Sequence, residues 1–375
     1  MKLQRMNRRA LSLGALAVSG ALALTACGTD DTGSSGGDSS SSATAAAGSI
    51  QCDDASGQIL ADGSSAQKNA IDAWVKNFTQ ACSGVQINYK GGGSGAGVTA
   101  FTQGTVAFAG SDSALEPEEI EASKEVCSGG QGIDLPMVGG PIAVGYNVPG
   151  VDNLVLDAPT LAQIFDNKIT NWNDEAIAKL NPDATLPDLK IQAFHRSEDS
   201  GTTDNFTKYL IETTPDNWKY EGGKAWQAEG GQAASGSSGM AQQVKQNSGA
   251  IGYMELSYAK DLSVVSVDTG AAAPVPASVD GATKAIADAK VVGTGKDLAL
   301  ELNYATKADG AYPITLVTYE IVCDAGNNAD TLPATKAFLT YIASEEGQQV
   351  LAENDYAPMP ADIISKVRTT VSELS

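Results

Sequence analysis

The sequence has 375 residues, which is long enough for two lobes of ordinary size, and carries 24 Lys and Arg against 45 Asp and Glu. The formal net charge of −21 argues against partners such as nucleic acid or an anionic lipid surface. An anionic ligand remains compatible with this charge, because salt screens the field of distant groups within about 10 Å.

Residues 1–26 have the pattern of an export signal. Four basic residues precede an apolar run over 10–24, and small residues then lead to Cys27. The pattern predicts a bacterial lipoprotein signal peptide, with Cys27 lipidated as the new N-terminus. An uncleaved membrane helix is the weaker alternative, because the run is shorter than the roughly 20 residues of a span. The Arg8-Arg9 pair leaves the general secretory and twin-arginine routes both open.

Residues 27–49 contain Gly, Ser, Thr, Ala and Asp but no large apolar side chain. This composition predicts a flexible linker that holds an anchored domain away from the membrane.

The rest of the chain alternates short apolar strands with amphipathic helices. Strands are expected at 57–62, 85–90, 106–110, 142–148, 191–194 and 314–322. A helix is expected after 66, with one buried face formed by residues at helical spacing, namely Ala70, Ile71, Trp74, Val75 and Phe78. Further helices are expected from about Ala96, and at 116–126, 161–165, 174–180, 204–210, 334–342, 345–352 and 361–374. Residues 271–287 are weakly patterned and are interpreted as surface structure. The alternation predicts an α/β fold whose sheets are mostly parallel, with ligands outside the carboxyl ends of the strands.

Four cysteines follow the linker, and an even number in an exported protein suggests two disulfides. Three pairings are possible. We favour Cys52–Cys82, which would bracket one strand–helix unit, and Cys127–Cys323, which would tie the C-terminal segment to the N-terminal lobe. Metal binding is disfavoured because the cysteine spacing is wide and the chain has one histidine.

Three Gly/Ser/Thr-rich turns, at 63–66, 91–97 and 199–203, each precede a predicted helix. Free N–H groups and the positive end of the helix dipole make such helix starts suitable for anions. Ser65 and Ser94 are therefore candidate ligand contacts, with plain N-capping as the alternative. A fourth such turn, at 236–244, is interpreted as an ordinary N-cap.

Asp112 follows a predicted strand and would face the same region. A carboxylate only accepts hydrogen bonds, so it suits an anion that retains a proton, such as hydrogen phosphate, and disfavours sulfate. The alternative is that Asp112 caps the segment after it.

The segment 195–203 combines an arginine with another helix start. Arg196 offers a planar fork for two phosphate oxygens, and Glu198 or Asp199 would hold its orientation. Ser200, Gly201 and Thr202 then begin a helix, whereas His195 is interpreted as structural.

Two short motif matches are discounted: S-x-x-K at 65–68 lacks the rest of an acyl-enzyme signature, and the Gly-rich turn at 91–97 is only a loose dinucleotide-binding fingerprint.

Together these segments resemble the phosphate-binding protein of high-affinity phosphate ABC transporters. The resemblance covers about residues 57–370 and includes DGSSAQKNAIDAW, GGGSGAGVTAF, VAFAGSD and HRSEDSGTT, together with WNDEAIAKLNP and GAIGYMELSYAK away from the ligand loops. It implies phosphate contacts at Ser65, Ala66, Ser94, Asp112, Arg196, Ser200, Gly201 and Thr202. Glu198 is the positional match for the partner of Arg196, although the family usually has Asp-Gly where this chain has Glu198-Asp199.

The resemblance implies a two-lobed periplasmic-binding-protein fold of type II, with the ligand in the cleft between the lobes. One lobe would comprise 50–147 plus 320–375 and the other 148–319, which places Cys127 and Cys323 in the same lobe. The expected protein is a monomer without cofactor or metal, anchored by lipid to the outer face of the cytoplasmic membrane. It would capture inorganic phosphate and deliver it to the permease subunits and ATPase of an importer. The alternatives are a binding protein for another oxyanion such as sulfate, a secreted phosphatase, and a second role as an adhesin.

Overall fold

The computed structural model describes residues 50–375. The predicted signal peptide, the lipidation site Cys27 and the linker over 27–49 lie outside these residues. No helix within residues 50–375 combines the length and apolar character that a membrane crossing requires.

A nine-stranded mixed sheet forms the framework, in the order β2-β1-β3-β14-β4-β8-β6-β7 with β9 paired to β4. Its strands are β1 (Gly57–Gly63), β2 (Val85–Tyr89), β3 (Phe108–Ser111), β4 (Gly132–Asn147), β6 (Gln192–Arg196), β7 (Gln232–Ala234), β8 (Ala250–Glu255), β9 (Ser263–Val264) and β14 (Thr315–Cys323). Pairing is parallel among β1, β2 and β3 and among β6, β7 and β8. It is antiparallel around β4 and β14, so the sheet is mixed where a mostly parallel one was expected.

Eleven helices and several short strands complete residues 50–375. The helices are α1 (Lys68–Ala81), α2 (Ser94–Thr102), α3 (Pro117–Ser123), α4 (Ala158–Phe165), α5 (Glu175–Leu180), α6 (Gly201–Thr213), α7 (Gly236–Gln246), α8 (Val279–Ile286), α9 (Leu332–Ala343), α10 (Glu345–Glu353) and α11 (Ala361–Ser372), with a 3-10 turn η1 (Leu256–Tyr258). The short strands are β5 (Val155–Asp157), β10 (Ser266–Asp268) and β11 (Val275–Pro276) in one small sheet, and β12 (Lys290–Val291) with β13 (Leu300–Glu301) in another.

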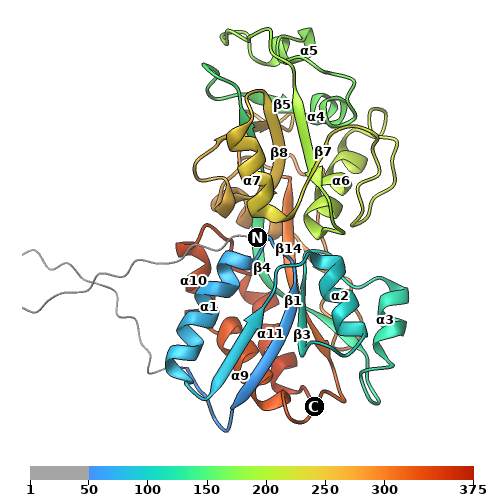
Figure 1. The fold of residues 1–375 in the computed structure, drawn as a ribbon, viewed down its shortest axis with the longest axis vertical. Helices are drawn as coiled ribbons and strands as arrows, with labels where there is room; N and C mark the ends of the chain where they lie inside the picture. The colour runs from blue at the N-terminus through green and yellow to red at the C-terminus, as the bar shows by residue number, and fades with distance from the viewer. Residues whose placement is uncertain (1–49) are drawn as a thin grey trace, which may run out of the picture. The chain divides into compact units, whose positions relative to one another are not determined.

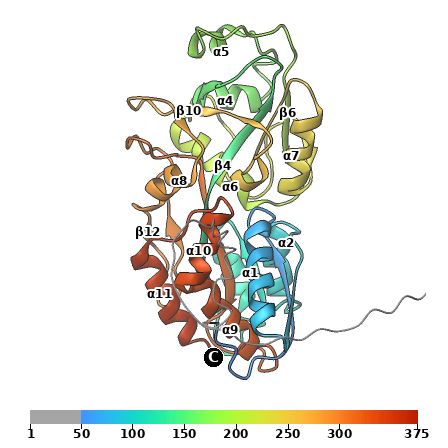
Figure 2. The same cartoon turned by 90° about the vertical axis from the view of Figure 1, so that its left-hand side faces the viewer.

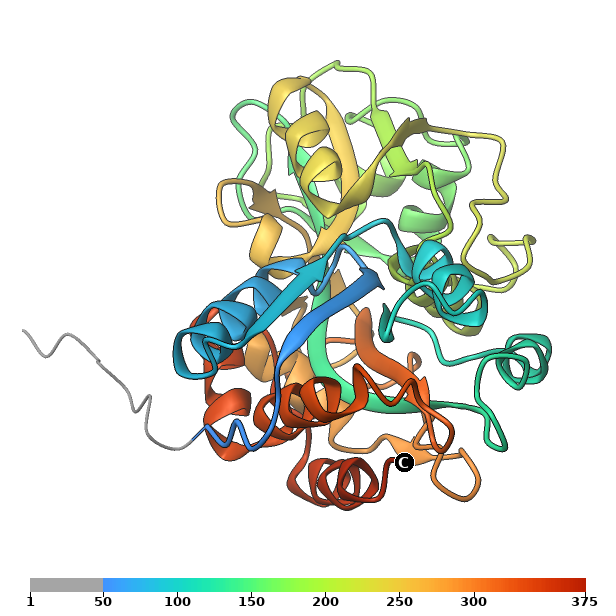
Figure 3. The ribbon, with the colours of Figure 1, turned by 60° about the horizontal axis from the view of Figure 1, so that its bottom comes forward.

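Helices cover both sides of the strands at each end of the sheet. Figures 1 and 3 show α1, α9 and α10 on one side of β1 and β3, with α2 and α3 on the other. Figure 2 shows α9, α10 and α11 grouped beside α1, and α6 and α7 near the other end of β4. The predicted face of α1 is confirmed, since Ala70, Ile71, Trp74 and Phe78 are all buried.

Buried apolar residues form two large cores, and β4 and β14 run from one to the other (Figure 1). On β4 the buried apolar side chains up to Val138 belong to the first core, whereas Ile142, Val144 and Tyr146 belong to the second and Ala143 belongs to a third, smaller cluster. On β14 the change falls between Leu316 and Val317. Two long strands therefore join the two cores, while the lobe boundaries given above stay a prediction.

Several elements differ from the sequence prediction. Strands β7 and β8 were not predicted, and β4 and α8 differ from what was expected over their residues. Strand β4 begins at Gly132, well before the expected 142, because prolines and glycines mask its apolar pattern. Pro136 is accommodated beside an irregularity in the register with β14, where a missing N–H is tolerated. The region expected as surface structure contains α8, whose Ala282 and Ile286 are buried in the first core. Its buried residues, Gly281, Ala282, Ala285 and Ile286, recur at helical spacing, a signal that the sequence interpretation overlooked.

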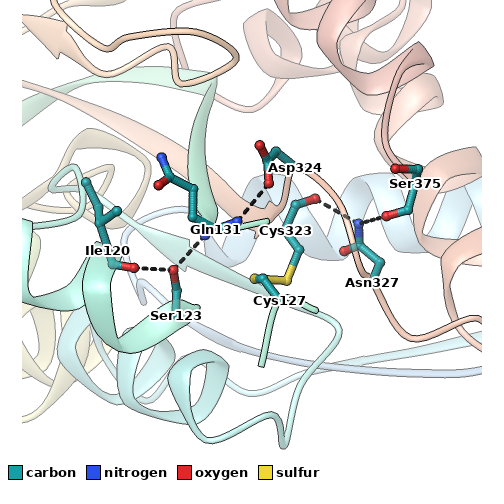
Figure 4. Close-up of a disulfide and its surroundings, with 9 residues drawn as sticks. Ile120, Ser123, Cys127, Gln131, Cys323, Asp324, Asn327 and Ser375 are labelled. Atoms are coloured by element: carbon teal, nitrogen blue, oxygen red, sulfur yellow. Dashed lines mark hydrogen bonds between the residues drawn. A yellow bond between two sulfur atoms is a disulfide. The ribbon is translucent and has the colours of Figure 1, made fainter. Parts of the chain in front are cut away.

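Both disulfides match the favoured pairing: Cys52 bonds Cys82, and Cys127 bonds Cys323. Around the second, Gln131 N donates to Asp324 at 2.8 Å, and Asn327 Nδ2 donates to the carbonyl of Cys323 at 2.8 Å and of Ser375 at 3.0 Å (Figure 4). This disulfide links the turn before β4 to the end of β14 and fixes the neighbourhood of the C-terminus.

Candidate functional site

Turns from both ends of the sheet meet at one place. The β1–α1 loop (64–67), the start of α2 and the end of β3 come from one end, and the β6–α6 and β7–α7 connections come from the other. Because β1, β2 and β3 are parallel, their carboxyl ends lie at a common edge, and the same holds for β6 and β7. Hydrogen bonds between these turns define the site.

Ser65 is the hydroxyl on which several groups converge. Its Oγ accepts from Arg196 Nη2 at 2.7 Å and from the Ser237 N–H at 3.0 Å. The residue is only 8% exposed. A loop from the first core is thereby bonded to two elements from the opposite end of the sheet.

Arg196 ends β6 and is almost completely buried, with a side-chain exposure of 1%. Its Nη1 donates to Thr202 Oγ1 at 3.2 Å, and its Nε donates to Glu198 Oε1 at 2.7 Å. A further bond from Nη2 to Glu198 completes an ion pair. Burial raises the pKa of Glu198, but the charge and hydrogen bonds of Arg196 outweigh it, so the pKa lies below its ordinary value. Glu198 thus stays ionised and fixes the plane of the guanidinium.

Asp112 follows β3 and is 3% exposed. Its carboxylate accepts from Thr202 Oγ1 at 3.1 Å and from Thr318 Oγ1 at 2.8 Å. Its own N–H donates to Ser94 Oγ at 3.1 Å. Burial raises the pKa of Asp112, opposed by hydroxyl hydrogen bonds and by the charge of Arg196. The carboxylate of Asp112 therefore has two hydroxyl donors: Thr202, which is a predicted site residue, and Thr318, which lies beside the site.

The start of α2 lies against the loop before α6. The helix begins at Ser94, two residues earlier than expected, with Gly93 at a φ of 107°. A Cβ on Gly93 would approach Glu198 Cγ to 2.9 Å, so the turn requires glycine there. Gly95 N donates to the Asp199 carbonyl at 3.0 Å. Of the two acids considered from the sequence, it is Glu198 that pairs with Arg196.

Gly201 and Ser200 form the start of α6. Ser200 is the N-cap, with its Oγ accepting from the Thr203 N–H at 3.4 Å. A Cβ on Gly201 would lie 2.7 Å from both Ser94 Oγ and Asp112 Cβ, so only glycine allows this helix start so close to the opposite turn. The Gly201 carbonyl accepts from Asn205 Nδ2, which also reaches the Asp112 carbonyl at 2.7 Å.

Ala66 contributes backbone only. Its N–H donates to Ser64 Oγ at 3.0 Å, within the β1–α1 loop, and its side chain is fully buried. His195 stacks on Trp226 with ring centroids 5.0 Å apart, and its Nδ1 lies 2.9 Å from the Arg196 carbonyl. This placement fits the structural role expected for His195.

The fourth turn contributes contacts that the sequence interpretation set aside. The Ser237 N–H donates to Ser65, and the Gly236 N–H donates to Glu198 Oε1 at 3.1 Å. Ser235, the N-cap of α7, makes no side-chain capping bond, so this start is not an ordinary N-cap. The sequence did carry a signal for this turn. It is the Gly/Ser pattern before a helix, which also indicated the turns at 63–66, 91–97 and 199–203.

An ion pair adds to the contacts beside these turns. Lys224 Nζ lies 2.6 Å from Glu119 Oε1, and Ser113 Oγ donates to Asp204 Oδ2 at 2.6 Å.

Among residues 50–375, no group of three or more His, Cys, Asp or Glu side chains is arranged to hold a metal ion. The described site is built from four helix starts, the guanidinium of Arg196 and the carboxylates of Glu198 and Asp112.

This combination suits a small tetrahedral oxyanion. Helix starts and hydroxyls donate to oxygen, a guanidinium fork binds two oxygens at once, and a carboxylate accepts from an acidic proton.

Comparisons with known proteins agree with this chemistry. A model for the PBP superfamily domain matches residues 43–346. Phosphate-binding protein PstS 3 of Mycobacterium tuberculosis is 40% identical over 376 residues, covering 99% of this chain and 100% of the relative. The chain belongs to this family of phosphate-binding proteins. PstS 2 of the same organism is 38% identical, covering 96% of this chain and 97% of the relative.

Solved structures agree on the fold. A high affinity periplasmic phosphate-binding protein solved with phosphate aligns with a TM-score of 0.69 at 21% identity, covering 84% of this chain and 93% of that one. A phosphate binding protein from Stenotrophomonas maltophilia aligns with a TM-score of 0.66 at 19% identity, covering 84% and 94%. The α/β periplasmic-binding-protein fold is thereby established for this chain.

Glu198→Gln tests the ion pair at the site. We expect the free energy of unfolding at pH 7 to fall by about 1–3 kcal/mol, the loss of a charge-assisted bond to a buried group. Because the folded pKa lies below the ordinary 4.5, the stabilisation is complete above that pH and is lost as pH falls through the folded value. Urea unfolding of both proteins between pH 7 and pH 3 measures this. Glu118→Gln, at an exposed position, is the control, and a deficit independent of pH would contradict the assignment.

Proposed function

We propose that this protein binds inorganic phosphate and delivers it to an ABC-type importer. The observation that carries the proposal is the buried guanidinium of Arg196, held by Glu198 and aimed at the hydroxyls of Ser65 and Thr202. Glu198 already neutralises the guanidinium from one side. On the other side Nη1 and Nη2 donate to the hydroxyls of Thr202 and Ser65, and the oxygens of a phosphate could replace these neutral acceptors with charged ones. The names of the relatives support the same ligand.

The proposed ligand contacts are those expected from the sequence, with one addition. They are Ser65, Ala66, Ser94, Asp112, Arg196, Ser200, Gly201 and Thr202, joined by the helix start at Ser237. Glu198 orients Arg196, and Thr318 orients Asp112. On this proposal the ligand lies between two lobes built on the two cores, and β4 and β14 provide the hinge.

The proposed context is outside the cytoplasmic membrane, with lipid at Cys27 as anchor and the permease subunits with their ATPase as partners. The protein acts there as a carrier and not as an enzyme. A phosphatase is the alternative from another class. The described site offers no metal cluster for phosphoryl transfer, and the enclosed position of Arg196 and Asp112 suits a free anion better than an ester.

Arg196→Ala is expected to weaken phosphate binding by at least about 2–3 kcal/mol, or roughly 30- to 150-fold, because it removes a charge-assisted fork. Isothermal calorimetry on the purified protein gives the affinity. Arg368→Ala is the matched control, since Arg368 donates to the Ala343 carbonyl beside α11. Near-normal affinity in Arg196→Ala would remove Arg196 from the site.

Phosphate is expected to bind more tightly than sulfate by about a hundredfold to several thousandfold. Sulfate has no proton for Asp112, and an unpaired buried charge costs about 3–5 kcal/mol. Competition calorimetry measures the ratio of the phosphate affinity to the sulfate affinity. Asp112→Asn should reduce this ratio, because an amide can donate a hydrogen bond to sulfate. Equal affinities for the two anions in the natural protein would contradict the role of Asp112.

No hydrolysis of a phosphate ester is expected, because residues 50–375 contain no metal-binding cluster that could activate a nucleophile for phosphoryl transfer. Release of p-nitrophenol from p-nitrophenyl phosphate, followed at several pH values with an alkaline phosphatase as positive control, measures this. Sustained turnover would favour the phosphatase alternative.

A further inference from the structure

Three tyrosine hydroxyls bind three successive carbonyls of the β1–α1 loop. Tyr89 donates to the Ser64 carbonyl at 2.9 Å. Tyr258 donates to the Ser65 carbonyl at 2.9 Å, and Tyr356 donates to the Ala66 carbonyl at 2.6 Å. The tyrosines come from the end of β2, from η1 and from the segment after α10. Three distant parts of the chain thus converge on three consecutive peptide groups.

Fixing a carbonyl also fixes the N–H of the same peptide. A trans peptide is planar, so its C=O and N–H point in opposite directions. Each tyrosine that holds a carbonyl therefore also sets the direction of the N–H in the same peptide, which belongs to Ser65, Ala66 or Gln67. In this structure the Ala66 N–H donates to Ser64 Oγ at 3.0 Å, a bond that an anion oxygen would replace. Consecutive N–H groups aimed in one direction form a concavity that binds anions.

Two of the hydroxyls are themselves held in place. Gln67 Nε2 donates to the Tyr89 hydroxyl at 3.0 Å. Ser257 Oγ donates to the Tyr356 hydroxyl at 3.0 Å and accepts from Asn69 Nδ2 at 2.9 Å. Tyr356 is fully buried, as is Ala66. Neither hydroxyl is free to rotate away, so the carbonyl directions are set by the fold.

We propose that Tyr89, Tyr258 and Tyr356 are positioning residues that aim the N–H groups of the β1–α1 loop at the bound phosphate. The inference rests on the proposed function and deepens it, because these tyrosines act through the peptide groups and not by touching the ligand.

Tyr258 adds a connection between the two cores. It follows β8, on which Ile251 and Tyr253 belong to the second core, whereas β1 and α1, which flank the loop, pack in the first. Ala66, within the loop, packs in the second core, and Tyr258 packs against a third, smaller cluster. The bond from Tyr258 therefore holds the loop against the elements that carry Arg196 and orients the Ser65–Ala66 peptide there.

Replacing each tyrosine with phenylalanine tests the proposal. Each of Tyr89→Phe, Tyr258→Phe and Tyr356→Phe should weaken phosphate binding about five- to tenfold, since the carbonyl loses its donor and the peptide its fixed direction. Tyr312→Phe is the matched control, because the Tyr312 hydroxyl donates at 2.8 Å to the Ile142 carbonyl on β4, outside the loop. Calorimetry gives the affinities, and thermal unfolding without phosphate checks that all four variants fold.

Amide resonances provide a readout that general destabilisation would not move. The phosphate-induced shift should shrink at Ser65 in Tyr89→Phe, at Ala66 in Tyr258→Phe and at Gln67 in Tyr356→Phe. The inference would be overturned if the three variants bound phosphate as tightly as Tyr312→Phe does. It would also be overturned if they bound phosphate more weakly but the phosphate-induced shifts at Ser65, Ala66 and Gln67 did not shrink. Either result would leave the proposed function intact. Failure of the natural protein to bind phosphate would overturn both.

Discussion

The structure depends on one hydrogen-bonded arginine. Arg196 lies at the end of β6, nearly inaccessible to solvent, and a buried cation is stable only when its donors are paired. Glu198 provides the counter-charge from the same loop, whereas Ser65 provides an acceptor from 131 residues earlier in the chain. The requirement to satisfy this one side chain draws loops from both cores to a common point.

The opposing carboxylate explains how a strongly acidic protein can be suited to an anion. Asp112 and Arg196 are linked through Thr202, which accepts from the arginine and donates to the carboxylate. The site therefore contains a positive group, Arg196, and a negative group, Asp112, that are bridged by a single hydroxyl. Hydrogen phosphate fits both groups, because its unprotonated oxygens accept from donors and its P–OH donates to the carboxylate. The net charge of −21 acts at longer range, where salt screens it.

The turns that meet at the candidate site could be predicted from the sequence, because each carries its own local signal, while their contact with phosphate stays a prediction. The Gly/Ser pattern before a helix marked Ser65, Ser94 and Ser200, and the helical spacing of Trp74 and its neighbours placed α1 correctly. The pairing of both disulfides was also predicted correctly.

What the sequence did not reveal depends on tertiary proximity. Ser237 has the same local pattern as an ordinary N-cap and joins the site only because β7 lies beside β6. The first half of β4 was missed because Pro136 suits a strand only at an irregular register that the partner strand creates. Likewise, no local feature of Tyr89, Tyr258 or Tyr356 indicates that their hydroxyls meet on neighbouring carbonyls.

The central claim is that four helix starts, Arg196 and Asp112 surround one phosphate. A crystal structure of the purified protein with phosphate tests this most directly. We predict one tetrahedral anion in contact with Ser65, Ser94, Arg196 and Thr202, with one of its oxygens within hydrogen-bond distance of the Asp112 carboxylate. Phosphate bound elsewhere, or bound here with Asp112 turned away from every oxygen, would contradict the account.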